Sequence, residues 1–318
     1  YPLRRQRQMC IRDRLTAAGY IAGWKIAGAL PAGLTSLAAQ WAADRVSDDG
    51  AGMEMLRRNL ARVVGPEHVT RELVQDAMRS YARYWLEAFR LPRLAGDPAL
   101  DSKLSAGLEG RDHLDAALSR GKGAVLTLPH SGNWDMAGMW LVAHYGQFAT
   151  VAERLRPEAL FNAFVEFRET LGFEVVPLSG AARAPYVRLK EVIEGGGIVC
   201  LLGERDFTRA GVPVSFFGDA TTFPAGPAKL ALDTGAPLLV AHSWFTGTRR
   251  DPGWGMRVSA PVKVTTLDET VQRVADAFAA NIAAHPADWH MLQPLWPADA
   301  PKPSRRKEFE QRQRAAGR

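Results

Sequence analysis

The stretch Leu126–Gly138, LTLPHSGNWDMAG, runs an apolar strand-like segment into a histidine, a small-residue turn and an aspartate five positions after the histidine. If a helix begins near Asn133, His130 lies in the strand-to-helix turn and Asp135 in the first helical turn. A carboxylate placed there can hold one ring nitrogen while the other accepts a proton, which predicts a general base with an orienting carboxylate. In the alternative interpretation, Asp135 complements the helix dipole while Asn133 or Ser131 caps the helix.

Strand-like and helical segments alternate outward from this stretch. Apolar strand segments are expected at 123–129, 148–154, 173–178, 197–203 and 237–245, and helices at 133–145, 157–171, 183–194 and 224–234. This alternation predicts an α/β fold, with a largely parallel central sheet flanked by helices and ligands at the carboxyl ends of its strands. Residues 255–264 are expected to add an antiparallel edge strand, and Asp268–His285 a final helix.

The N-terminal part predicts a helical extension of a single domain that spans residues 15–298. Residues 15–45 are rich in Ala, Leu and Ile and carry Tyr20, Trp24 and Trp41. Such a weakly charged aromatic segment suits a helix lying on a membrane surface, although packing on the domain core is equally consistent. A further helix is expected at about Thr70–Phe89.

The two chain ends are predicted to lie outside this domain. Arg4–Asp13 are the translation of a common sequencing-library adapter, so residues 1–14 are expected to be an adapter-derived scar. Without its five arginines and one aspartate the formal net charge falls from +6 to +2, and no nucleic-acid partner is expected. Residues 299–318 form a basic tail, interpreted as solvated, with anionic lipid as the alternative contact.

Several function classes lack their sequence signatures. One of the two cysteines lies in the suspected scar, so no disulfide framework exists and a reducing compartment is expected. The sequence contains no apolar run of about 20 residues and no secretory signal, which argues against a membrane span and against export. Neither a metal-binding motif nor a nucleophile elbow occurs, so no metal and no covalent serine intermediate are expected.

Charged residues follow two further predicted strands. Glu204, Arg205 and Asp206 come directly after the apolar segment 197–203, where they would face the same crevice as His130. The alternative is an ordinary solvated loop.

Glu153 likewise lies at the end of the segment 148–154, and Arg168 lies near the end of the helix that follows it. An arginine at a helix end is favourable for the helix dipole whatever its function.

HSGNWD at residues 130–135 resembles the H-x4-D signature of the lysophospholipid acyltransferase superfamily. The segments LRRNLARVVG (56–65), GERDFTRAGVPVSFFGDATTFPAGPAKLAL (203–232) and HPADWHMLQPLWPAD (285–299) look like the phosphatidylinositol mannoside acyltransferases, relatives of the lipid A late acyltransferases. The resemblance covers about residues 15–297. GERD stands where the glycerolipid branch has FPEGTR, which disfavours a glycerol-phosphate acceptor.

The resemblance implies transfer of a fatty acyl group, taken to be palmitoyl, from acyl-CoA to a mannose hydroxyl of a membrane glycolipid. The enzyme would act without a bound cofactor, a metal or a covalent intermediate, as a peripheral protein on the cytoplasmic face of the cell membrane. His130 would deprotonate the hydroxyl, Asp135 would orient His130, and Glu204 would hold or activate the acceptor.

Further roles follow from the same resemblance. Glu153 would support the histidine, Arg168 would bind the acceptor head group, and Arg205 and Asp206 are taken as substrate-binding residues. Amides at the helix start after His130 are candidate oxyanion donors.

An apolar tunnel for the acyl chain is expected along the helix after His130. Its candidate residues are Trp134, Met136, Met139 and Trp140, although such side chains at helical spacing also suit an ordinary core. Two rival functions stay open: a lipid A type acyltransferase with acyl carrier protein as donor, and a noncatalytic lipid-binding protein that keeps the fold.

Overall fold

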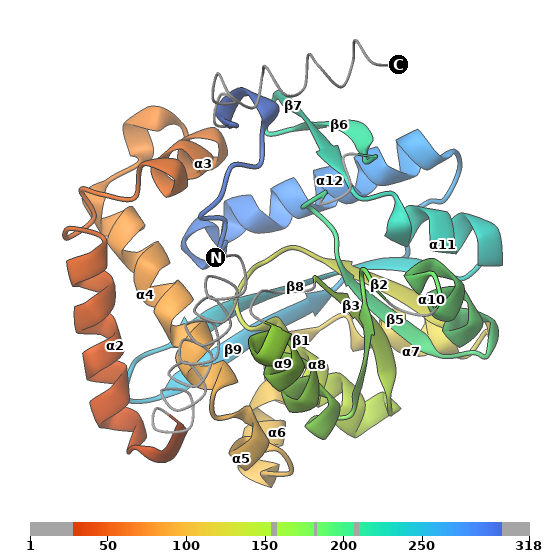
Figure 1. The fold of residues 1–318 in the computed structure, drawn as a ribbon, viewed down its shortest axis with the longest axis horizontal. Helices are drawn as coiled ribbons and strands as arrows, with labels where there is room; N and C mark the ends of the chain where they lie inside the picture. Colours follow the sequence, from red (N-terminus) through yellow and green to blue (C-terminus); the bar gives the residue numbers. More distant parts are fainter. Residues whose placement is uncertain (1–27, 154–157, 181–182, 207–209, 301–318) are drawn as a thin grey trace, which may run out of the picture.

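A computed structural model of the chain describes residues 28–153, 158–180, 183–206 and 210–300 (Figure 1). The predicted scar, the extension up to residue 27 and the tail from residue 301 lie outside the described residues.

A seven-stranded sheet forms the centre of the molecule. Its spatial order is β1 (Leu108–Glu109), β9 (Pro252–Val258), β8 (Leu238–Gly247), β2 (Ala124–Leu128), β5 (Ile198–Leu202), β3 (Phe148–Ala152) and β4 (Phe173–Pro177). The central strand β2 runs parallel to both neighbours, β5 and β8. The predicted α/β fold with a largely parallel sheet is therefore confirmed.

The strand predicted within residues 255–264 is antiparallel as expected, but it starts earlier and is not at the edge. β9 pairs antiparallel with β8 on one side and parallel with the two-residue strand β1 on the other. The sequence signal of β1 is too short to detect, because two residues carry no periodicity.

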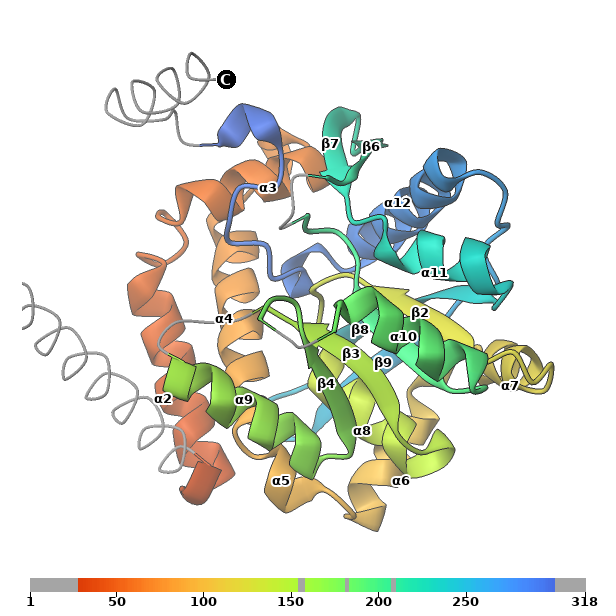
Figure 2. The ribbon, with the colours of Figure 1, turned by 45° about the vertical axis from the view of Figure 1, so that its right-hand side comes forward.

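Helices cover both faces of the sheet (Figures 1 and 2). One face packs against α6 (Pro98–Ala106), α7 (Arg111–Leu118), α8 (Trp134–Tyr145) and α9 (Glu158–Thr170), and the other against α10 (Pro185–Glu194), α11 (Gly226–Thr234) and α12 (Leu267–Ala284). Successive residues of β2 serve opposite cores: Val125 packs with the second group of helices and Leu126 with the first. This alternation is the two-residue period of a strand buried on both faces.

The N-terminal helices form a third core beside the sheet. They are α2 (Ala32–Val46), α3 (Glu54–Val64) and α4 (Arg71–Ala88), with the 3-10 turn η1 (Pro66–His68) before α4. The short α5 (Leu91–Leu94) packs instead in the core that α8 shares with the sheet. α2 packs along α4 (Figure 2), and Leu60 and Val74 are fully buried between the helices. Thr70 caps α4 by accepting from the amide of Leu73, so the helix predicted at 70–89 is confirmed.

A second, two-stranded sheet was missing from the sequence interpretation. β6 (Val212–Phe216) pairs antiparallel with β7 (Asp219–Phe223). Phe217 and Gly218 have φ of 52° and 83°, as the two central residues of a primed hairpin turn require. The last elements of the described part of the chain are the 3-10 turns η2 (Pro286–Asp288) and η3 (Pro297–Asp299).

Within the described part of the chain, no helix combines the length and the apolar character needed to cross a membrane.

Candidate active site

His130 lies at the carboxyl end of β2, in the turn before α8. The side chain of Asn133 caps α8 by accepting from the amide of Met136 at 3.0 Å. The helix therefore begins at Trp134, which puts Asp135 in its first turn, as the sequence predicted. The imidazole of His130 keeps 17% of its surface exposed, so a substrate can reach it.

Glu204 is the residue that holds the imidazole. Its side chain is fully buried, and Oε1 accepts from the backbone amide of His130 at 2.5 Å and lies 2.7 Å from Nδ1 of the same residue. The parallel register pairs Leu128 of β2 with Leu202 of β5, so the residues that follow the two strands come together. Donation of Nδ1–H to the carboxylate assigns the tautomer with a lone pair on Nε2.

Asp135 contacts other groups than the imidazole, and the predicted Asp135–His130 contact is corrected. Asp135 is 2% exposed; Oδ1 accepts from Nε of Arg168 at 2.8 Å, and Oδ2 from the hydroxyl of Tyr84 at 2.9 Å. The first turn of α8 directs this carboxylate towards α4 and α9, while β5 supplies the partner of His130.

The buried environment of Asp135 shifts the pKa values of its two partners, Arg168 and Tyr84. Burial alone would lower the pKa of the Arg168 guanidinium, but the charge of Asp135 and the Tyr84 hydroxyl outweigh it, so the pKa is raised. Burial, reinforced by the charge of Asp135, raises the pKa of Tyr84 well above its ordinary value. Arg168 thus stays charged and Tyr84 stays a neutral donor, which keeps Asp135 engaged.

The other predicted binding residues lie at the same edge of the sheet. Glu153 follows β3 directly and is exposed. Arg205 donates to Oε1 of Gln293, and Asp206 accepts from the amide of Gly211 at 2.8 Å. Substrate binding by Glu153, Arg168, Arg205 and Asp206 stays a prediction.

An apolar cavity lies between α8 and the sheet, next to the turn that carries His130. Its lining residues come from all seven strands of the sheet, from Leu108 of β1 to Phe173 of β4. Of the predicted tunnel residues, Trp134 and Trp140 line the cavity. Met136 and Met139 are not lining residues and pack in the core beside it.

Tyr84 and His290 are site neighbours that the sequence interpretation did not single out. The ring of Tyr84 stacks on Trp134 with centroids 4.0 Å apart, and Trp134 meets His130 edge to face. The backbone amide of His290 donates to the carbonyl of His130 at 2.8 Å. The only sequence signal for His290 was its place in the motif HPADWHMLQPLWPAD at 285–299.

In the described part of the chain, no cluster of three or more His, Cys, Asp or Glu side chains could hold a metal ion.

A histidine with a carboxylate on Nδ1 can deprotonate an alcohol, and the adjoining cavity has an apolar lining that suits a hydrocarbon chain. Together they define a site of the acyltransferase class. Residues 5–298 match the family of bacterial lipid A biosynthesis acyltransferases, and the chain belongs to this family.

The chain is similar over most of its length to two curated acyltransferases. It is 53% identical, over 90% of its length and 93% of the relative, to the phosphatidylinositol mannoside acyltransferase of Mycolicibacterium smegmatis. It is 52% identical, over 88% of both chains, to the protein of the same description from Mycobacterium tuberculosis. The resemblance inferred from the sequence is confirmed, and the protein is an acyltransferase.

Proposed function

We propose that this enzyme transfers a palmitoyl group from palmitoyl-CoA to a mannose hydroxyl of a phosphatidylinositol mannoside. The acceptor is supported by identity above 50% to two relatives that carry this description. An acyl donor is supported by the apolar lining of the cavity beside His130, which suits a hydrocarbon chain. In this proposal residues 15–298 are one acyltransferase domain, with the adapter-derived scar before it and the basic tail 299–318 after it.

Proton transfer in the proposed reaction is carried by His130. Nε2 takes the proton from the acceptor hydroxyl, and the carboxylate of Glu204, 2.7 Å from Nδ1, stabilises the imidazolium that forms. Glu204 thus replaces Asp135 as the orienting carboxylate in the mechanism inferred from the sequence.

The acyl group moves in a single displacement. The acceptor oxygen bonds to the thioester carbonyl carbon, the resulting tetrahedral oxyanion collapses, and the carbon–sulfur bond breaks. The imidazolium of His130 returns its proton to the leaving CoA thiolate, so no covalent enzyme intermediate forms. Backbone amides at the start of α8 are the proposed oxyanion donors, because the first amides of a helix have no intrahelical partner and this helix start adjoins the turn that carries His130.

The acceptor head group is proposed to lie over the carboxyl edge of β3 and β5. In this proposal Glu153, Arg205, Arg168 and Asp206 bind its hydroxyl and phosphate groups. Arg168 is already paired with Asp135, so it supplies a guanidinium whose position is fixed before the acceptor binds.

The outer face of α2 supports binding to a membrane surface. Leu34, Leu37 and Trp41 recur at helical spacing and are 65%, 49% and 70% exposed. Large apolar side chains grouped on one helix face are typical of helices that lie in the lipid interface. The proposed location is the cytoplasmic face of the cell membrane, where a glycolipid acceptor and acyl-CoA meet.

The contact between Glu204 and His130 carries this proposal, and removing the imidazole tests it. Wild type and His130→Ala are compared in the transfer of palmitate from palmitoyl-CoA to phosphatidylinositol mannosides in mixed micelles. A loss of about 10² or more is expected. Equal rates would show that His130 is not the base and would favour the noncatalytic lipid-binding function. Transfer only from acyl carrier protein to lipid A precursors would favour the lipid A type enzyme.

A further inference from the structure

The segment 288–299, called the C-terminal strap below, pairs with the catalytic turn. The amide of His290 donates to the carbonyl of His130 at 2.8 Å, and the amide of Gly132 donates to the carbonyl of Asp288 at 2.9 Å. Ser131 and Trp289 form an antiparallel bridge between these two bonds. The strap therefore adds a short antiparallel ladder to the backbone that carries the catalytic histidine.

We propose that the strap is a positioning element for His130, and that Asn59 of α3 and Ser80 of α4 are the positioning residues that anchor it. The proposal rests on the proposed function of His130 as the general base. It gives a role to the motif segments 56–65 and 285–299, which take no direct part in the proposed reaction.

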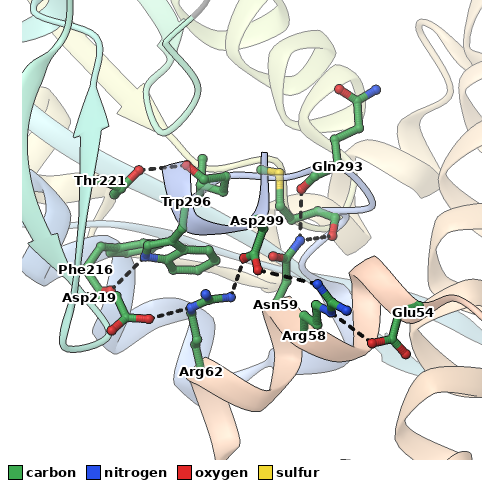
Figure 3. A network of polar contacts seen from close by, with 12 residues as sticks. Glu54, Arg58, Asn59, Arg62, Phe216, Asp219, Thr221, Gln293, Trp296 and Asp299 are labelled. Atoms are coloured by element: carbon green, nitrogen blue, oxygen red, sulfur yellow. Dashed lines mark hydrogen bonds and ion pairs between the residues drawn. The ribbon is translucent and has the colours of Figure 1, made fainter. Parts of the chain in front are cut away.

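Asn59 holds the strap from α3. The residue is fully buried, and its Nδ2 donates to the carbonyls of Met291 at 2.7 Å and Gln293 at 3.0 Å. Figure 3 shows Asn59 reaching the strap next to Asp299, which forms an ion pair with Arg62 of the same helix at 2.7 Å. The side-chain amide of Asn59 thus supplies the hydrogen bonds that these two backbone carbonyls would otherwise make with water.

The other side of the strap rests on the β6–β7 hairpin. The hydroxyl of Thr221 donates to the carbonyl of Leu295 at 2.7 Å, and the indole of Trp296 donates to the carbonyl of Phe216 (Figure 3). Arg62 lies over the ring of Trp296 at 4.3 Å. The strap is therefore held between α3 and the hairpin, elements that approach it from opposite sides.

Ser80 holds the beginning of the strap from α4. Its hydroxyl donates to Oδ1 of Asp288 at 2.6 Å, and it lies 2.9 Å from Nε2 of His290. Because the hydroxyl proton goes to the carboxylate, Nε2 of His290 has to donate to the Ser80 oxygen. Oδ2 of Asp288 accepts from the amide of Phe245 in β8, which ties the strap to the central sheet as well.

His290 is neutral in this arrangement. Burial, with a smaller effect from His130, lowers its pKa to about 3. The strap therefore brings no positive charge next to His130, where it would oppose formation of the imidazolium. Its contribution at the site is the backbone contact.

Two opposed contacts fix the backbone of His130. Glu204 accepts from its amide, and His290 donates to its carbonyl. The turn also packs closely on β8, since a Cβ on Gly132 would lie 2.5 Å from the carbonyl oxygen of Ser243. Loosening the strap frees one of the two contacts, and a displacement of about 1 Å at a catalytic group can lower the rate about 10²-fold.

The test compares Asn59→Asp and Ser80→Ala with wild type in the full chain. Asn59→Asp keeps the side-chain shape but turns a carboxylate oxygen towards two carbonyls, and Ser80→Ala removes one hydroxyl. Each variant is expected to lower kcat about 10- to 100-fold. The KM for palmitoyl-CoA is expected to stay within about twofold, because no residue of the strap lines the apolar cavity.

A structural probe separates positioning from a general loss of folded protein. In protein with 15N-labelled histidine, the hydrogen-bonded Nδ1–H of His130 gives a low-field proton signal, identified by its absence in His130→Gln. The signal is expected to shift or broaden in Asn59→Asp and Ser80→Ala. The control is Leu230→Ala, a variant of a fully buried residue on α11, which is expected to leave the signal unchanged.

The outcomes distinguish the two proposals. Wild-type kcat in both anchor variants, or an unchanged His130 signal in both, would overturn the role of the strap while leaving the general base in place. Full activity of His130→Ala would instead overturn the proposed function. If Asn59→Asp fails to fold, Ser80→Ala alone decides, since it removes a single oxygen at the beginning of the strap.

Discussion

Replacement of Glu204 by glutamine tests the pairing that the structure assigns to His130. Glu204→Gln keeps the side-chain shape, so an oxygen can still accept from the backbone amide and from Nδ1–H of His130. The variant removes the negative charge that stabilises the imidazolium. At a charge separation of about 4 Å and an effective dielectric constant of about 20, that attraction amounts to about 4 kcal/mol. We therefore expect kcat to fall about 10³-fold.

The assay measures initial rates of palmitoyl transfer to phosphatidylinositol mannosides in mixed micelles, with thermal unfolding as the control for folding. Asp135→Asn is measured beside it, because Asp135 contacts Arg168 and Tyr84 instead of the imidazole. A Glu204→Gln rate within tenfold of wild type, together with a large loss in Asp135→Asn, would refute the reasoning. That result would mean that Asp135 holds the imidazole during turnover.

Three further results are expected. Cys200→Phe, which adds a ring inside the apolar cavity, should lower transfer from palmitoyl-CoA at least about tenfold relative to octanoyl-CoA, and an equal loss for both donors would contradict an acyl role for the cavity. Leu37→Glu and Trp41→Glu should each weaken binding to anionic vesicles at least about tenfold, because each removes an exposed apolar side chain from α2. Co-sedimentation measures this binding, and unchanged binding would argue against α2 as the membrane face. Burial lowers the pKa of His242 and His290 to about 3, so the stability they contribute is complete above about pH 6.5 and is lost as the pH falls towards 3. His242→Leu should therefore reduce the slope of unfolding free energy against pH by up to about 1.4 kcal/mol per unit between pH 6 and 4, and identical slopes in urea unfolding would contradict neutral burial.

The elements that the sequence predicted are those with a clear local period. The strands at 123–129, 148–154, 173–178, 197–203 and 237–245 all exist, because each is an apolar run bounded by turn residues. The β6–β7 hairpin was missed although its first strand alternates buried and exposed residues. Its turn carries Phe217 at positive φ, a place where the usual Asn or Asp would have given a recognisable signal.

In the candidate site, too, the sequence predicted the features that depend on local patterns. H-x4-D identified His130, and the strand-end rule brought Glu204 to the same crevice, since parallel strands end at one edge of a sheet. The sequence analysis assigned Asp135 to the imidazole, because Asp135 is the nearer carboxylate along the chain, and this assignment was wrong. The β2–β5 register settled the partner.

The sequence by itself determined the fold class, the acyltransferase family and His130 as the candidate base. Strand period, turn composition and a short motif are local properties of the chain. Only the tertiary structure decided that Glu204 holds His130, that Asp135 belongs to Arg168 and Tyr84, and that the C-terminal strap pairs with the catalytic turn. Asn59 and Met291 are 232 positions apart. Contacts over such separations depend on strand register and on the direction in which each helix turns its side chains, and neither is encoded in any local pattern.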